Sequence, residues 1–267
     1  MRVTHIKATL SKQISLRLLK VIIPPCKSVI PKDELASYAV AINENPANAR
    51  PSSPGGRSKR AIGTWSKFWS NGRTLKIAFT DNPPPPLRKA IQAQISKWQS
   101  SINLTFEFIE SGYSDIRIKT GSDHNDSAVG TDALLYEQHM PTLNLSVDTA
   151  HPSFERIVLH EFGHALGLQH EHQHPKATIP WDKPKTYKFY KDQFGWNEDD
   201  VDFNLFKPLE INEHFLTPYD KDSIMHYVVD NEVTTGDFEV GDNSKISMLD
   251  RRAMRKIYPK PRSLVGL

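Results

Sequence analysis

Residues 160–171 read HEFGHALGLQHE, and this stretch decides which fold the chain can adopt. The chain has 267 residues and 11 histidines, and five of these histidines fall between residues 160 and 174. His160 and His164 are four residues apart, so on a helix their side chains lie on one face, with Cα atoms about 6 Å apart. This spacing allows two imidazoles to reach one metal ion.

The residues after His164 supply a third ligand. Gly167 follows three residues later, and because glycine tolerates a positive φ, the helix can end there and the chain can turn sharply. His170 can then return to the metal from another direction. Three protein nitrogens with an open fourth position are typical of a catalytic zinc site. Glu161 projects beside such a metal, where a carboxylate can take a proton from metal-bound water.

Two further histidines, His172 and His174, follow the turn. We interpret them as residues of a solvated loop that ends at Pro175, and not as additional ligands. The competing interpretation of the whole cluster is a set of helix histidines at a polar surface. The complete HExxHxxGxxH spacing favours the metal site, because each of its five positions has a role in building one.

The remaining sequence alternates strand-like and helix-like patterns. Period-2 alternation predicts strands, and apolar residues spaced three and four apart predict helices. The predicted strands cover residues 74–80, 104–110, 115–120 and 142–147, and the predicted helices cover 87–102, a stretch beginning near 153, 185–194, 199–206 and 247–257. This alternation favours an α+β fold in which a mixed sheet packs against helices.

Charge divides the chain into two parts. Residues 1–60 carry a net charge of +8 and the remainder carries −5. Residues 31–60 pass from a short helical pattern into a linker rich in proline, serine and glycine, so we place a boundary near Arg60. The predicted parts are a basic leader with a flexible linker, 1–60, and a body, 61–267.

The leader fits no targeting signal well. Its apolar part is interrupted by Arg17 and Lys20, whereas a secretory signal needs an unbroken apolar stretch of about 7–15 residues. A transit peptide is one alternative, and a solvated basic tail is the interpretation we prefer. No apolar run reaches the roughly 20 residues that cross a bilayer. Nucleic-acid binding is not expected, because the basic segment lacks interleaved aromatic residues or a folded motif.

Cysteine usage limits the chemistry of the body. The single cysteine, Cys26, lies in the leader. The body therefore has no disulfide, no thiolate zinc ligand and no cysteine nucleophile.

At this point the sequence resembles a known family. HEFGHALGLQHE and residues 219–227, YDKDSIMHY, are similar to the signatures of the astacin-like zinc metallopeptidases of the metzincin superfamily. The resemblance covers about residues 65–258. It implies a twisted, mixed five-stranded sheet with the active-site helix in an N-terminal lobe, about 61–167. It also implies a largely irregular C-terminal lobe with a final helix, 168–267, and one catalytic zinc ion in the cleft between the lobes.

The resemblance also implies roles for individual residues. Met225 would form the Met-turn, a hydrophobic floor beneath the three imidazoles. Tyr227 would help to hold the oxyanion when a peptide carbonyl is attacked. Peptide substrates would bind as an added strand at a sheet edge near Ala128 to Gly130.

An activation step is a further hypothesis. Lys59-Arg60 is a dibasic pair in the linker, and cutting after it would leave Ala61 as a new N-terminus. By the resemblance, that α-amino group would pair with Glu171 and the full chain would be a zymogen. The aspartate motif that caps zinc in some family zymogens is not evident.

These observations predict a zinc-dependent endopeptidase with Glu161 as general base. The alternative is an inactive peptide- or zinc-binding protein that keeps the metzincin fold. The expected partner is a protein or peptide substrate, and we expect a monomer. The resemblance favours secretion, whereas the absence of a clean signal and of disulfides favours the cytoplasm.

Overall fold

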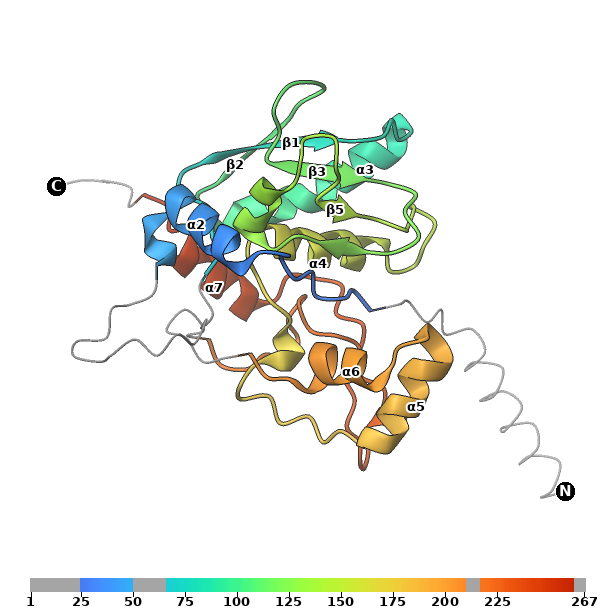
Figure 1. Cartoon of the computed structure of the whole chain (residues 1–267). Helices are drawn as coiled ribbons and strands as arrows, with labels where there is room; N and C mark the ends of the chain where they lie inside the picture. The colour runs from blue at the N-terminus through green and yellow to red at the C-terminus, as the bar shows by residue number, and fades with distance from the viewer. Residues whose placement is uncertain (1–24, 50–65, 210–216, 262–267) are drawn as a thin grey trace, which may run out of the picture.

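The computed structural model describes residues 25–49, 66–209 and 217–261. Its upper part in Figure 1 is a five-stranded mixed sheet with the strand order β2-β1-β3-β5-β4. Strands β1 (Thr74–Phe79), β2 (Thr105–Phe108), β3 (Ile116–Lys119) and β5 (Leu143–Asn144) are parallel, and β4 (Asp126–Ser127) pairs antiparallel with β5. The predicted mixed five-stranded sheet is confirmed, with β4 at its edge.

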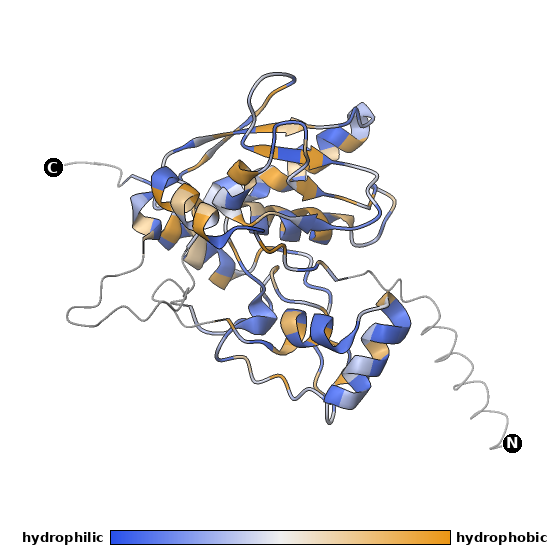
Figure 2. Cartoon of the chain, in the orientation of Figure 1, coloured by the Kyte–Doolittle hydropathy of each residue, from blue (hydrophilic) through white to orange (hydrophobic). Residues whose placement is uncertain are grey.

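One face of the sheet is buried against two helices. In β1, Leu75 and Ile77 are buried while Lys76 between them is exposed, which is the period-2 pattern of a half-buried strand. The buried side chains join one core with helices α3 (Pro85–Ser96) and α4 (Phe154–Ala165). Figure 2 shows the apolar residues gathered on the strands and on the helices next to them.

The helix predicted over residues 87–102 is shorter in the structure. It begins in the proline run, where proline at the first helical position loses no hydrogen bond. It ends at Ser96, and a 3-10 helix, η2 (Lys97–Ser101), continues it and buries Trp98. The apolar spacing therefore predicted which residues are buried but not where the α-helix ends.

The lower part of the molecule has little regular structure (Figure 1). Helix α5 (Lys183–Phe194) begins at the N-cap Asp182 and ends at Gly195 in the left-handed region. Helix α6 (Glu198–Val201) leads directly into a π-helix, η5 (Asp202–Phe206), where one longer helix was predicted. Short 3-10 helices occupy η1 (Pro46–Asn48), η3 (Gly130–Leu135), η4 (Glu171–Gln173) and η6 (Asn231–Val233).

The final helix, α7 (Met248–Ile257), returns to the core of the upper part. It begins with a capping box between Ser247 and Asp250. Met254 and Tyr258 belong to the main core, and the Tyr258 hydroxyl donates to the Leu166 carbonyl over 2.8 Å. This contact holds the end of the chain against the end of α4.

The leader folds onto the body between residues 25 and 49. Helix α2 (Glu34–Glu44) is capped by Asp33, and its buried Ser37 donates a hydrogen bond to Asp132. The residues before α2 run between the upper and lower parts (Figure 1). Helix α2 agrees with the short helical pattern predicted after residue 31, whereas the prediction of a solvated tail before it is wrong for Cys26, which is buried. The Lys59-Arg60 pair lies outside the described residues.

The helices of the described residues are all too short or too polar to cross a membrane.

Candidate active site

Helix α4 places His160 and His164 side by side, both fully buried. The Nδ1 atom of His160 lies 2.8 Å from the Ile224 carbonyl oxygen, and Nδ1 of His164 lies 2.8 Å from that of Leu168. Because a carbonyl oxygen only accepts, each Nδ1 must carry the proton. The Nε2 atom of each ring therefore presents a lone pair, which is the arrangement of a metal-ligating histidine with an outer hydrogen bond.

His170 joins these rings after a sharp turn. Gly167 has φ of 99°, and a Cβ atom added to it would lie 2.6 Å from the Phe68 ring, so both conformation and space require glycine there. The turn brings His170 Nε2 to 3.0 Å from His164 Nε2. Two nitrogens at this distance need a cation or a proton between them, because two facing lone pairs repel. The donor set fits a zinc ion.

Burial keeps the three rings neutral. Desolvation lowers the pKa of His164 to about 4 and holds the pKa values of His160 and His170 well below the usual range. The neighbouring histidines lower the pKa values of His160 and His170 further. Neutral imidazole is the form that binds metal, so burial keeps these three side chains in the protonation state that a metal site requires. The alternative of a polar-surface cluster is wrong for these buried rings.

Glu161 is buried next to the rings. Desolvation raises its pKa to about 8, and a hydrogen bond from Cys26 opposes this effect. A cation held by the imidazoles would lower that pKa again, because an opposite charge favours the carboxylate. The side chain thus lies where a general base for a metal-bound molecule would be.

Met225 packs directly beneath the helix that carries the ligands. The glycine at position 163 leaves room for it, because a Cβ atom there would collide with the Met225 sulfur. The turn before Met225 is tied to α7, since Asp250 accepts from Ser223 Oγ over 2.7 Å and from Ile224 N over 2.9 Å. The sequence motif at residues 223–227 therefore lies against α4.

Tyr227 faces the same site from the lower part of the molecule. Its ring lies 4.5 Å from that of His170 and stacks on that of His172 at 4.0 Å, measured between centroids. Its hydroxyl donates to the backbone carbonyl of Cys26. Tyr227 thus already contacts a peptide carbonyl inside the cleft.

Cys26 is the site residue that the sequence analysis missed. Its Sγ and one nitrogen from each of His160, His164 and His170 all lie within 4.8 Å of one another. The thiol is buried and donates to Glu161 Oε2 over 3.3 Å. The body itself has no cysteine, but the leader brings a thiol to the three imidazoles.

The backbone after Cys26 is also held in the cleft. Ser28 N donates to Asn204 Oδ1 over 3.0 Å, and Ser28 Oγ lies 3.2 Å from His170 Nδ1. The only sequence signal for this arrangement was the presence of one cysteine in an otherwise cysteine-free chain. Nothing in its spacing from His160, 134 positions later, could indicate the contact.

The interpretation of His172 and His174 as solvated loop residues is wrong. Both are buried, with 3% and 5% of their surface exposed. His172 Nε2 donates to the Asn204 carbonyl over 2.7 Å, and His174 Nε2 lies 3.2 Å from the Thr217 carbonyl. These hydrogen bonds connect the turn after His170 to the lower part of the molecule. Neither residue belongs to the cluster of possible metal ligands.

Glu171, the residue after the third ligand, is largely buried. Its Oε1 accepts from Asp220 N over 2.8 Å, and desolvation raises its pKa to about 8. Among residues 25–49, 66–209 and 217–261, no lysine, arginine or histidine forms an ion pair with it.

Comparisons with known proteins agree with this geometry. The chain is 26% identical over 248 residues to zinc metalloproteinase dpy-31 of Caenorhabditis elegans, which covers 85% of this chain and 37% of that protein. It is 33% identical over 130 residues to human matrix metalloproteinase-20, covering 42% of this chain and 26% of that protein. The chain therefore spans about a third of the length of these relatives.

Solved structures show the same fold. The structure of myroilysin is 35% identical with a TM-score of 0.67, and the match covers 73% of this chain and 97% of that one. High choriolytic enzyme 1 from the medaka Oryzias latipes is 18% identical with a TM-score of 0.53, covering 72% and 94%, which is a likeness of fold alone. The model of the astacin peptidase family matches residues 61–259. With the ligand geometry and this match together, the chain belongs to the astacin family of metzincin metallopeptidases.

Proposed function

We propose that the chain is a zinc-dependent endopeptidase that uses one catalytic zinc ion. The observation that carries this proposal is the convergence of three buried, neutral imidazoles from His160, His164 and His170, with Glu161 beside them. The zinc-dependent family to which the chain belongs supports the choice of metal. A binder that had lost turnover would have no need for a buried carboxylate next to the ligands.

A zinc ion held by these rings would activate the attacking water and polarise the scissile carbonyl. Glu161 would accept the proton of that water and deliver it to the leaving amine. Its carboxylate already accepts a hydrogen bond from a group at this position, the Cys26 thiol at 3.3 Å, so its reach is sufficient.

Tyr227 would stabilise the negative charge that develops on the carbonyl oxygen. A neutral hydroxyl donor aimed at a peptide oxygen is suited to this task, and here it donates to the carbonyl of Cys26. His172 stacks on the ring and thereby fixes its orientation. We place Tyr227 among the catalytic residues and His172 among those that position it.

The substrate would bind in an extended conformation along β4. This strand pairs on one side with β5 and ends the sheet on the other, next to residues 128–130. An edge strand offers unpaired backbone groups that a peptide can join. The location agrees with the edge proposed from the sequence.

We also propose that the described leader keeps the full chain latent. The Cys26 thiol takes the place beside Glu161 that an attacking water would need, and the Cys26 carbonyl takes the Tyr227 hydroxyl. Desolvation and Glu161 raise the pKa of the thiol well above its usual range in the absence of a cation, while a bound zinc ion would favour the thiolate. Removal of the leader would free both catalytic groups at once.

Metal removal tests the peptidase assignment. We expect a full-length chain carrying Cys26→Ala to hydrolyse an unfolded protein and to lose this activity in 1,10-phenanthroline, because the attacking water is no longer activated. Adding zinc should restore it, with one zinc ion per chain by elemental analysis. The non-chelating isomer 1,7-phenanthroline is the control. Hydrolysis that continues after complete loss of zinc would contradict the assignment.

A further inference from the structure

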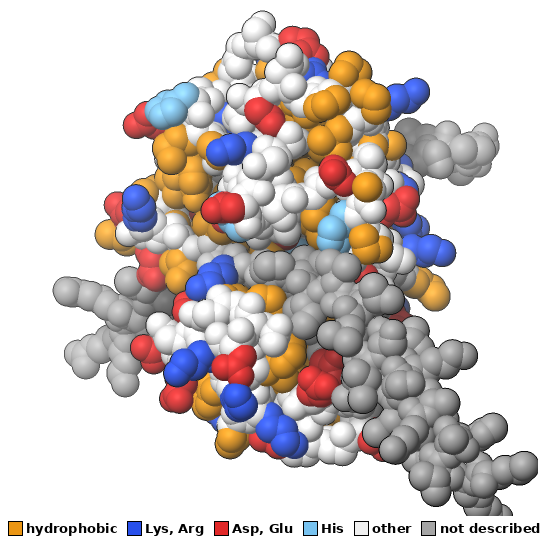
Figure 3. Space-filling view, turned by 90° about the vertical axis from the view of Figure 1, so that its right-hand side faces the viewer, with side chains coloured by type: hydrophobic (Ala, Val, Ile, Leu, Met, Phe, Trp, Pro, Cys, Tyr) orange, Lys and Arg blue, Asp and Glu red, His pale blue; other side chains and the backbone are white. Residues whose placement is uncertain are grey.

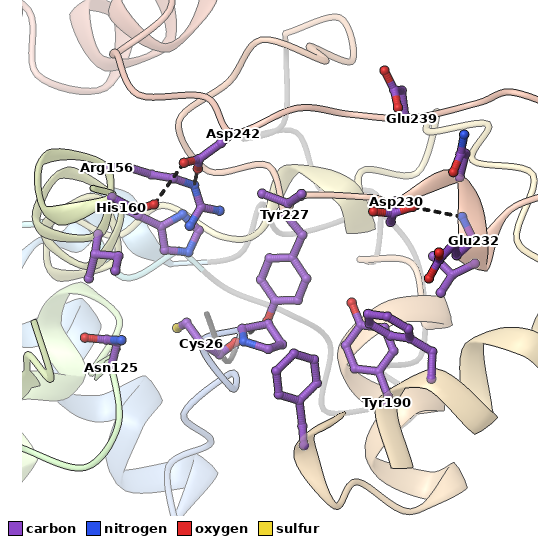
Figure 4. A pocket seen from close by; sticks show the side chains of 18 of the residues that line it. Cys26, Asn125, Arg156, His160, Tyr190, Tyr227, Asp230, Glu232, Glu239 and Asp242 are labelled. Atoms are coloured by element: carbon purple, nitrogen blue, oxygen red, sulfur yellow. Dashed lines mark hydrogen bonds and ion pairs between the residues drawn. The ribbon is translucent and has the colours of Figure 1, made fainter. Parts of the chain in front are cut away.

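A cavity of about 470 Å³ opens beside the ligands and continues into the lower part of the molecule. Figure 4 shows His160, Cys26 and Tyr227 on one side of it and Tyr190 on another. Because Tyr227 lines the cavity, a peptide whose carbonyl lies near its hydroxyl can place a neighbouring side chain there. The lining of the cavity therefore decides which side chain is preferred.

The charge of this lining is negative. Arg156 is the one lysine or arginine among the described lining residues, and its Nε lies 2.7 Å from Asp242 Oδ1, with which it forms an ion pair. Besides Asp242 and Glu161, three further acidic residues line the cavity, namely Asp230, Glu232 and Glu239. A cation in the cavity is favoured and an anion is disfavoured.

The visible surface adds no single-sign field around the cavity. The face in Figure 3 shows positive and negative side chains interspersed over both parts of the molecule. The whole chain carries a net charge of only +3. The carboxylates of the lining therefore provide a preference that acts at short range, inside the cavity.

The opposite wall suits the stem of a long basic side chain. Phe189, Tyr190 and Phe194 from α5 present aromatic rings to the cavity. Lysine and arginine bury their methylene stems against apolar surface while the charged end stays with polar partners, and the charge is attracted to ring faces.

A buried donor in the lining points to a peptide. Asn125 is 6% exposed, and its Nδ2 has no hydrogen-bond partner within the described part of the chain. Figure 4 shows the side chain at the edge of the cavity, on the side of His160 and Cys26. An amide donor at this place can donate a hydrogen bond to a backbone carbonyl of a bound peptide.

The leader offers the same chemistry. Pro25 lines the cavity, and the 24 residues that precede it in the sequence include five lysines and arginines and no acid. On the other side of Cys26, Lys27 lies 2.9 Å from Asp200 and 5.0 Å from the Trp196 ring centroid. This contact lies outside the lining of the cavity, and it pairs a leader lysine with a carboxylate and an aromatic ring at the surface.

From these observations we propose that the cavity selects substrates with lysine or arginine at a position next to the cleaved bond. Glu232 and Glu239 act as specificity-determining residues, and Arg156 is a structural partner of Asp242 and does not recruit acidic side chains. This inference rests on the proposed peptidase function.

Two measurements test it in the full-length chain carrying Cys26→Ala. Mass spectrometry of digests of a mixed-sequence unfolded protein gives the residues that flank each cut, and paired peptides with lysine or glutamate at the selected position give kcat/KM. We expect a preference for lysine of at least about tenfold, because the carboxylates of the lining attract an ammonium group and repel a glutamate side chain. In the double variant Glu232→Gln, Glu239→Gln it should fall to roughly twofold. Asp237→Asn, exposed on the same loop but outside the lining, is the control and should keep the preference.

Binding separates failure of this inference from failure of the peptidase assignment. Fluorescence anisotropy with the same labelled peptides is measured on a chain that also carries Glu161→Gln, which binds without cutting. Tighter binding of the lysine peptide supports the proposal about the cavity. If no chain cuts any peptide, that absence of cleavage contradicts the peptidase assignment and leaves the binding result as support for the cavity. Equal binding, equal cleavage or a preference for glutamate would overturn the proposal.

Discussion

Replacing Glu161 with glutamine is expected to lower kcat/KM for peptide hydrolysis by about 10²- to 10⁴-fold, the range contributed by a general base. The amide keeps nearly the size and shape of the carboxylate but cannot accept the proton of the attacking water. Because Glu161 is not among the clustered ligand atoms, the zinc content should stay at that of the parent chain. Both chains should carry Cys26→Ala, so that latency does not mask the difference.

A second glutamate on the same helix gives a matched control. Glu155 lies in the first turn of α4 and is exposed, so Glu155→Gln changes the charge of the helix by the same amount away from the site. It should retain the parent activity. Equal loss of activity in the two variants would show an effect of charge on the helix, and full activity of Glu161→Gln would mean that the base has been misassigned.

Replacing Cys26 with alanine in the full-length chain is expected to raise proteolytic activity. The substitution removes the sulfur beside the imidazoles, so the leader, including the residue-26 carbonyl that accepts from Tyr227, should leave the cleft more often. A tenfold rise in activity requires that the binding of the leader in the cleft weaken by about 1.4 kcal/mol. We expect the loss of a zinc–thiolate contact to weaken this binding by more. Activity is measured on an unfolded protein before any cleavage of the leader, as judged by intact mass.

Thiol reactivity provides a second readout of the same contact. In the zinc-loaded parent chain, Cys26 should react slowly with a thiol reagent, and removal of the metal should accelerate the reaction. Lys32→Ala, an exposed change in the same leader, is the control and should leave the chain latent. Two results together would show that the sulfur does not bind the metal. These are an activity of Cys26→Ala no higher than that of the parent, and a Cys26 thiol in the parent that reacts equally fast with and without the metal.

The convergence of the three imidazoles was predictable because its information is local. Spacings of four and six residues, with glycine at residue 167, determine a helix face, a turn with φ of 99° and the return of His170. The sheet was predictable for a similar reason, since burial of alternate residues appears directly in the sequence as period-2 patterning. Here the local preferences and the tertiary structure agree.

The surroundings of the site depend on contacts between distant residues, which no local pattern records. His172 is buried because the Asn204 carbonyl, 32 positions later, accepts its hydrogen bond. Cys26 reaches Glu161 across 135 positions, in a leader whose composition favours a solvated tail. The cavity next to the site likewise combines α4, α5 and η6, so its charge emerges only from the fold.

X-ray absorption at the zinc edge of the full-length chain tests the central claim most directly. The account predicts one zinc ion with three nitrogen neighbours at about 2.0–2.1 Å and one sulfur neighbour at about 2.3 Å. In Cys26→Ala, the sulfur shell should be replaced by oxygen while the three nitrogens remain. A spectrum with fewer than three imidazole nitrogens, or with no sulfur in the parent chain, would contradict the account.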